Sequence, residues 1–178
     1  MKMIETRIPG VLVLEPKVFS DPRGFFLETY SERVFSELGI KEQFVQDNQS
    51  HSKKGVLRGL HYQSEHAQGK LVRVLQGEIF DVVVDLRRQS PTFGKWVAER
   101  LSSENKKMLW VPKQFAHGFY TLSNSADVAY KVTDFYAPQS EKTLLWNDPD
   151  VGIVWPLEGE PILSDKDRAG HRLKEYAG

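Results

Sequence analysis

The sequence of 178 residues contains no cysteine, and this absence excludes several kinds of chemistry. Without thiols the chain has no disulfide framework, no thiolate zinc site and no cysteine nucleophile. The titratable groups that remain for chemistry near neutral pH include five histidines and 24 acidic side chains. We therefore expect histidine and carboxylate chemistry.

The chain also lacks a net charge and lacks long hydrophobic runs. Its 24 basic and 24 acidic residues cancel, so we expect no general attraction to nucleic acid or to an anionic membrane. No segment approaches the roughly 20 apolar residues that a membrane-spanning helix needs. Residues 1–10 carry charges of both signs before Pro9 and Gly10, unlike a signal peptide. These features favour a cytoplasmic protein that binds neither nucleic acid nor membrane.

Short segments rich in β-branched and aromatic residues dominate the sequence. Strands are predicted at 11–14, 24–30, 44–47, 56–63, 70–75, 79–86, 96–101, 107–111, 115–122 and 128–135. Their close spacing leaves no room for crossover helices, so we expect one all-β domain over residues 1–178, built as an antiparallel sandwich, jelly roll or barrel. Short helices are predicted at 31–38 and 164–168, with Ser31 and Ser164 as caps. The tail from Trp146 is expected to pack onto the barrel.

Four predicted strands each bring one polar side chain to an otherwise apolar face. Side chains two apart in a strand point the same way, and this alternation selects His61, Lys70, His117 and Tyr130. Leaving such a group unpaired in a core costs about 1–3 kcal/mol. We interpret the four as lining a polar pocket for a small ligand, with His61 and Tyr130 facing each other across it.

Arg58 does not fit this alternation, because a strict strand places it on the face opposite His61. Two explanations remain open. Either Gly59 forms a bulge that turns Arg58 inward, or Arg58 serves another surface, such as a subunit interface.

Each of these residues also has a purely structural interpretation. His61 alone fits a satisfied core histidine, Tyr130 fits core packing, and Lys70 fits a side chain that extends from a strand end. His117 has small neighbours, which often mark close approach to a ligand. Arg23 belongs to an Asp-Pro-Arg-Gly sequence, which first of all indicates a turn; phosphate binding by the arginine is the second interpretation.

Six segments distributed through the chain form a more specific signature. They are FSDPRGFF (19–26), FVQDN (44–48), VLRGLHYQ (56–63), QGKLVR (68–73), FAHGF (115–119) and LWND (145–148). Together they closely resemble the dTDP-4-dehydrorhamnose 3,5-epimerase family, from about Ile8 to Asp167. The resemblance implies a cupin-type jelly roll with short peripheral helices and no metal or other cofactor. It also implies a homodimer that exchanges strands, and a dTDP-4-keto-6-deoxy sugar as substrate.

The residues present fit the reaction of that family. Inverting C3 and C5 of a 4-keto sugar needs a base, a stabilised enolate and an acid on the opposite face. By the resemblance, His61 is the base, Asp167 fixes its tautomer and raises its basicity, and Tyr130 is the acid. Lys70 stabilises the enolate oxygen, and His117 either assists there or binds the phosphate side.

The resemblance also implies a set of substrate-binding residues. Arg23 and Arg58 match diphosphate-binding positions, where arginine can bind bidentately. Phe19 and Phe26 offer aromatic stacking surface. Contacts to the thymine base and the nearby sugar are expected from Glu28, Gln46 and Asn48. Glu141 and Lys166 also match binding positions of the family, without an independent chemical argument.

Three alternatives stay open. A metal-binding cupin would use His61, Glu65 and His117, but Gln63 stands where such proteins usually have the second histidine of a His-x-His pair. A related enzyme would invert only C3 or only C5. A non-catalytic module would bind a sugar nucleotide without exchanging its protons.

Overall fold

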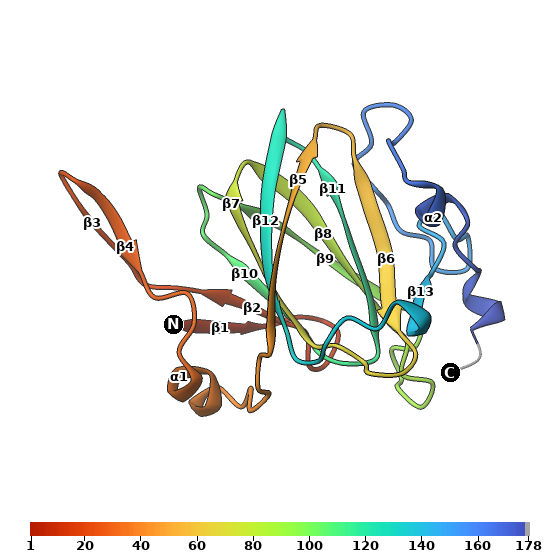
Figure 1. Ribbon diagram of the computed structural model, residues 1–178, viewed down its shortest axis with the longest axis horizontal. Coiled ribbons are helices and arrows are strands. Elements are labelled where there is room, and N and C mark those ends of the chain that lie inside the picture. Colours follow the sequence, from red (N-terminus) through yellow and green to blue (C-terminus); the bar gives the residue numbers. More distant parts are fainter. Residues whose placement is uncertain (177–178) are drawn as a thin grey trace.

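The computed structural model describes residues 1–176, which form two stacked antiparallel sheets and a projecting hairpin (Figure 1). The six-stranded sheet contains, in spatial order, β1 (Lys2–Glu5), β2 (Leu12–Glu15), β10 (Met108–Val111), β7 (Lys70–Gln76), β12 (Ser125–Val132) and β5 (Gln46–Lys53). The five-stranded sheet contains β13 (Glu141–Thr143), β6 (Leu57–Gln63), β11 (Phe115–Thr121), β8 (Glu78–Asp85) and β9 (Trp96–Ser102). The predicted all-β architecture is confirmed.

The remaining elements lie around these sheets. Strands β3 (Val18–Asp21) and β4 (Gly24–Leu27) form the hairpin that extends away from the body at the left of Figure 1. The helical segments are α1 (Glu32–Glu37), η1 (Pro138–Ser140), α2 (Asp165–Arg168) and η2 (Leu173–Glu175). Both predicted helices are present. The Ser164 hydroxyl accepts a hydrogen bond from the Asp167 backbone N–H as expected, whereas Ser31 occupies the N-cap position without a side-chain bond.

Several strand boundaries differ from the prediction for identifiable reasons. β5 begins at Gln46 and continues to Lys53, although only 44–47 was predicted, because it pairs along its whole length with β12. Its polar sequence gives no apolar alternation to detect. β1, β3 and β13 were not predicted at all, since each has only three or four residues and depends on a neighbouring strand.

Alternation along β8 divides the apolar residues into two layers. Val83 points between the sheets and packs in a cluster with Val72, Leu109 and Val128. Val82 and Val84 point to the other side and pack with residues of the C-terminal tail, including Trp155. The prediction that the tail packs onto the barrel is therefore confirmed. Helix α2 contacts β6, where Asp167 accepts the Gly59 backbone N–H, and this contact matters for the site.

A bulge in β6 resolves the position of Arg58. Opposite β11, His61 pairs with His117 and Arg58 pairs with Phe119, so three steps on β6 match two on β11. Gly59 has a φ of +114°, and a Cβ there would lie 2.6 Å from the Gly118 Cα atom. Only glycine fits this close approach. The bulge explanation is confirmed, and it turns Arg58 to the same side as His61.

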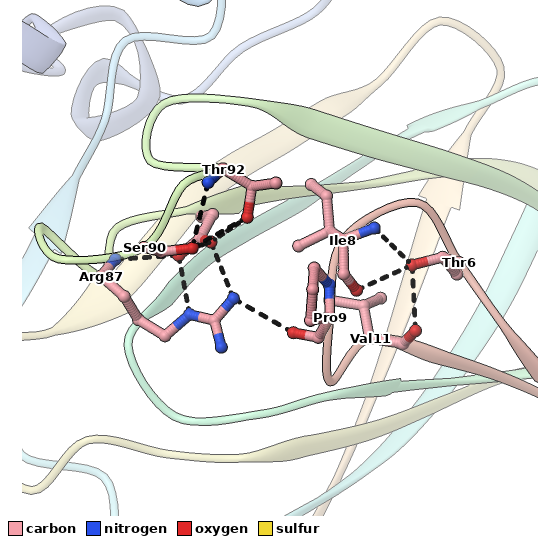
Figure 2. Close-up of polar contacts among 8 residues, drawn as sticks. Thr6, Ile8, Pro9, Val11, Arg87, Ser90 and Thr92 are labelled. Atoms are coloured by element: carbon pink, nitrogen blue, oxygen red, sulfur yellow. Dashed lines mark hydrogen bonds and ion pairs between the residues drawn. The ribbon is translucent and has the colours of Figure 1, made fainter.

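A polar cluster around the buried Asp85 ties the N-terminal turn to the turn between β8 and β9 (Figure 2). The Arg87 guanidinium donates to the Pro9 carbonyl at 3.1 Å and pairs with Asp85 at 2.7 Å. Burial raises the pKa of Asp85, but hydrogen bonds from Arg87, Thr92 and Ser90 outweigh it and lower the pKa to about 2. Asp85 therefore remains ionised over the whole physiological range.

The first prediction concerns the stability that this carboxylate contributes. Its native pKa of about 2 lies below the ordinary 3.8, so its contribution is present above pH 4 and is lost as pH falls toward 2. We expect Asp85→Asn to lower the free energy of unfolding by about 2 kcal/mol at pH 7. The difference from the unaltered protein should shrink near pH 2.

Urea unfolding followed by tryptophan fluorescence at several pH values measures both effects. Glu158→Gln is the control, because its ion pair with Lys54 is exposed and such pairs contribute little. An Asp85→Asn loss that is the same at pH 7 and near pH 2 would contradict the assignment.

No helix within residues 1–176 is long and apolar enough to span a membrane.

Candidate active site

A cavity of about 380 Å³ is lined by residues of both sheets. Most of the predicted site residues share this cavity: Gln46, Asn48, Arg58, His61, Lys70, His117, Tyr130, Glu141 and Lys166. Tyr130 comes from β12 in the six-stranded sheet, and His61 comes from β6 in the five-stranded sheet. The two side chains therefore reach one ligand-sized space from different sheets.

Four predicted binding residues do not line this chain's cavity. Phe19, Arg23 and Phe26 lie on the β3–β4 hairpin or its turn, and Glu28 follows it. The Phe26 side chain is 71% exposed, and the Arg23 guanidinium pairs with Asp21 at 2.6 Å in a strongly exposed position. The hairpin extends away from the body (Figure 1), so these residues present aromatic and charged side chains to solvent.

Asp167 lies directly behind His61 and is itself held in place. Its Oδ1 atom is 2.5 Å from His61 Nε2 and also accepts the Gly59 backbone N–H, while its Oδ2 atom accepts the Ser164 hydroxyl. Burial raises the pKa of Asp167, but these hydrogen bonds outweigh it, so the pKa is lowered and the group is ionised. A carboxylate can only accept, so His61 Nε2 carries the hydrogen and Nδ1 holds the free lone pair.

Burial sets the basicity of His61. It lowers the pKa of the imidazole below 6.5, and the positive charges of Lys166 and Lys70 act in the same direction. Asp167 raises the pKa, as the sequence predicted, but does not compensate for burial. The ring is therefore neutral at pH 7, in the form that can accept a proton.

Lys70 supplies positive charge inside the cavity. Its Nζ atom donates to the His61 backbone carbonyl at 3.2 Å. Burial lowers the pKa of the ammonium to about 8, with Asp81 and Glu141 opposing that shift and Lys166 adding to it. Lys70 is thus mainly charged at pH 7 but close to its titration range.

Tyr130 has the opposite character to His61. Burial raises the pKa of its phenol above 10, and the Arg58 charge only partly opposes this. The hydroxyl is therefore fully protonated near neutral pH. The cavity thus combines a neutral imidazole with a protonated phenol, which is the pairing that a base and an acid require.

Of the residues in or beneath the cavity that were not predicted as site residues, Tyr136 and Asp81 bear most directly on its chemistry. Tyr136, in the connection from β12 to β13, lines the mouth of the cavity and donates its hydroxyl to Glu141 at 3.0 Å. A connecting segment has no strand alternation that would indicate where its side chain points. Asp81 is buried beneath His117, and the alternation rule would have found it, because it shares a face of β8 with Ile79 and Val83.

The metal alternative is not supported by the arrangement of the described residues. Across residues 1–176, no group of three or more histidine or carboxylate side chains is arranged to hold a metal ion. His61 is paired with Asp167 and His117 with Asp81, while Glu65 is exposed and is not part of the cavity lining.

Comparison with known proteins shows the family and the fold of the chain. The family model described as dTDP-4-dehydrorhamnose 3,5-epimerase matches residues 5–175. The dTDP-4-dehydrorhamnose 3,5-epimerase of Pseudomonas aeruginosa is 58% identical over 171 residues, covering 96% of this chain and 94% of that protein. The enzyme of the same description from Salmonella typhimurium is 58% identical over 177 residues, covering 98% of this chain and 97% of that protein.

A solved structure extends the likeness to three dimensions. The dTDP-6-deoxy-D-glucose-3,5-epimerase of Legionella pneumophila, crystallised with dTDP-4-keto-L-rhamnose, superposes with a TM-score of 0.96 at 54% identity. The match covers 98% of this chain and 93% of that one. The cupin-type jelly roll predicted from the sequence is thereby confirmed, and the chain belongs to the dTDP-4-dehydrorhamnose 3,5-epimerase family.

Proposed function

We propose that the cavity converts dTDP-4-dehydro-6-deoxy-D-glucose to dTDP-4-dehydro-L-rhamnose, with His61 as the base and Tyr130 as the acid. The observation that carries this assignment is their joint placement. A neutral imidazole and a protonated phenol reach one cavity from different sheets, so a sugar ring between them meets a proton acceptor on one side and a donor on the other.

Each inversion is a pair of proton transfers. His61 Nδ1 takes the proton from the carbon next to the ketone, and the C–H electron pair forms a C=C bond while the C4 oxygen becomes an enolate. Tyr130 then gives its phenolic proton to the opposite face of that carbon, and the ketone re-forms. Solvent removes the proton from the imidazolium and returns one to the phenolate, so the same pair can act at the other carbon.

Lys70 is the proposed stabiliser of the enolate. Charge develops on the C4 oxygen only as the C–H bond breaks, so a buried ammonium there favours the transition state over the ground state. His117 lines the same cavity and is the second group available to that oxygen. Asp167 acts through His61 by fixing which ring nitrogen is free.

The cationic side chains at the cavity suit the diphosphate of the substrate. Arg58 and Lys166 both line it, and Arg58 is oriented by hydrogen bonds to the Ser52 hydroxyl and the His51 carbonyl. Gln46 and Asn48, joined by a 2.8 Å hydrogen bond, offer polar groups to the nucleoside. Tyr136, at the mouth, offers an aromatic face to its base.

The hairpin residues extend this proposal to a homodimer. Phe19, Arg23, Phe26 and Glu28 lie outside their own chain's cavity, and the hairpin carries exposed aromatic side chains that gain from burial. We assign them to the cavity of a second copy, where Arg23 adds a diphosphate contact and the aromatic rings add stacking surface. The proposed location is the cytoplasm, because the substrate is a nucleotide-activated sugar.

Proton exchange in heavy water tests the double epimerisation. The chain incubated with dTDP-4-dehydro-6-deoxy-D-glucose in D₂O should introduce deuterium at both C3 and C5, read by NMR or mass spectrometry. Deuterium at one carbon alone would indicate a mono-epimerase. Tight dTDP binding with no deuterium uptake would indicate a binding module.

Two variants separate the base from the acid in the same assay. His61→Ala should lose exchange at both carbons while still binding dTDP, because no other group removes the proton. Tyr130→Phe should retain measurable exchange at one or both carbons but slow net epimerisation by about 10²- to 10⁴-fold, the usual contribution of a positioned acid. Loss of all exchange in Tyr130→Phe with normal exchange in His61→Ala would reverse the assignment.

The pH dependence of kcat/KM should be bell-shaped. The acid limb should lie below pH 6.5, because activity is lost as pH falls through the lowered pKa of His61 and the ring becomes protonated. The alkaline limb should lie at about pH 8, because Lys70 loses its charge as pH rises through its pKa. Lys70→Arg should keep the acid limb and lose the alkaline one, since arginine stays charged. An alkaline limb that survives in Lys70→Arg would exclude Lys70 as its source.

Mixed dimers test whether the hairpin acts in the second copy. We co-express His61→Ala with Arg23→Ala, each of which should be strongly impaired alone. Half of randomly assembled dimers are heterodimers, each with one intact cavity, so about a quarter of full activity should return. His61→Ala with Lys70→Ala is the matched control, because both changes affect a chain's own cavity and none is left intact. Equal activity in the two mixtures would contradict the exchange.

A further inference from the structure

Asp81 is a buried carboxylate beneath the cavity to which the proposed reaction has given no role. It lies on β8 with 0% exposure, and its Oδ1 atom is 2.7 Å from His117 Nε2. Its Oδ2 atom is also buried and has no hydrogen-bond partner among residues 1–176. An ionised carboxylate in such a position is costly unless nearby positive charge compensates it, so its surroundings need an explanation.

Neighbouring strands place Asp81 diagonally across from His117, within hydrogen-bond distance of its ring. β8 pairs with β11 so that Asp81 lies opposite Phe119, and β11 pairs with β6 so that His117 lies opposite His61. The result is two histidines on adjacent strands, each backed by a carboxylate: His61 by Asp167 and His117 by Asp81. Only the first of these pairs is used as a base in the proposed reaction.

Lys70 reaches the same region from the facing sheet. The charged groups that act on its ammonium are Asp81 on β8, Glu141 on β13 and Lys166 on α2. Glu141 already pairs with Lys166 at 2.9 Å and accepts the Tyr136 hydroxyl. Geometry supports the other carboxylate: Lys70 lines the same cavity as His117, and Asp81 is bonded to that His117 ring.

We propose that Asp81 is a positioning residue of the epimerase. It holds His117 through Nε2, which leaves Nδ1 as the ring nitrogen available to the cavity, and it serves as the buried counter-charge of Lys70. Both groups are thereby kept ready for the C4 oxygen as it gains charge. This inference rests on the roles proposed above for Lys70 and His117, and it adds Asp81 as the residue that positions them.

The alkaline limb of the pH profile is the measurement that a purely structural role would not change. Asp81→Asn keeps the shape and removes the negative charge, so Lys70 should lose its proton at lower pH. We expect the alkaline limb of kcat/KM to move down by about one pH unit, the size expected from loss of a neighbouring opposite charge. Activity should accordingly fall more at pH 8 than at pH 6.5, while the affinity for dTDP should change little.

Asp85→Asn is the matched control for this variant. Asp85 lies on the same strand four residues later and is equally buried, but its partners Arg87, Ser90 and Thr92 lie outside the cavity lining, whereas the partner of Asp81 lies within it. The Asp85→Asn variant should have a lower free energy of unfolding, without a shift in the alkaline limb of kcat/KM. An Asp81→Asn variant that loses the same fraction of activity at every pH, as a merely destabilised protein would, overturns the inference.

Failure of this inference is distinguishable from failure of the proposed function. If Lys70→Arg abolishes the alkaline limb but Asp81→Asn leaves it at the same pH, Lys70 is the source of the limb and Asp81 is not its counter-charge. If the limb persists in Lys70→Arg, the proposed role of Lys70 itself is wrong.

A measurement on the unaltered protein covers the case in which Asp81→Asn does not fold. Nitrogen-15 NMR of the histidine rings, with His117→Gln to assign the His117 signals, should show hydrogen on Nε2 of that ring. A His117 ring that carries hydrogen on Nδ1 alone would contradict the pairing with Asp81.

Discussion

The contact between His61 Nε2 and Asp167 is the interaction on which the site depends. It joins residues 106 positions apart, one on β6 and one in a helix of four residues. The helix is held because its cap, Ser164, and the carboxylate bond each other, and because the tail packs on the outer layer of the five-stranded sheet. Packing of the tail therefore decides which nitrogen of the His61 imidazole is free.

Burial gives the proposed base, His61, and the proposed acid, Tyr130, their opposite properties. The same low-polarity surroundings disfavour the charged form of each group, so the imidazole stays neutral and the phenol stays protonated. The lysine between the sheets responds in the same way, and its pKa falls to about 8. Burial thus keeps the imidazole neutral and the phenol protonated, and it brings the Lys70 ammonium close to its titration range. The carboxylates of Asp81 and Glu141 limit how far the pKa of Lys70 falls.

The proposed proton-transfer residues and the hairpin residues proposed to bind the nucleotide lie in different parts of the fold. The proposed base and acid come from strands that are paired on both sides: β6 lies between β13 and β11, and β12 lies between β7 and β5. The hairpin residues assigned to the nucleotide half lie on an exposed two-stranded extension. In the proposed dimer, the hairpin of one copy completes the cavity of the other, which couples substrate binding to assembly.

The sequence by itself determined the all-β class, the strands with apolar alternation and the polar positions His61, Lys70, His117 and Tyr130, because side-chain alternation is a local property of a strand. It did not determine the extent of β5, whose polar residues become a strand only by pairing with β12. Nor did it place Arg58, which depends on a close approach of Gly59 to Gly118. Tertiary structure alone decided the lowered pKa of His61, the burial of Asp81 under His117 and the separation of the hairpin from its own cavity. Each of these depends on the distance between residues remote in sequence, and alternation along a strand carries no information about that distance.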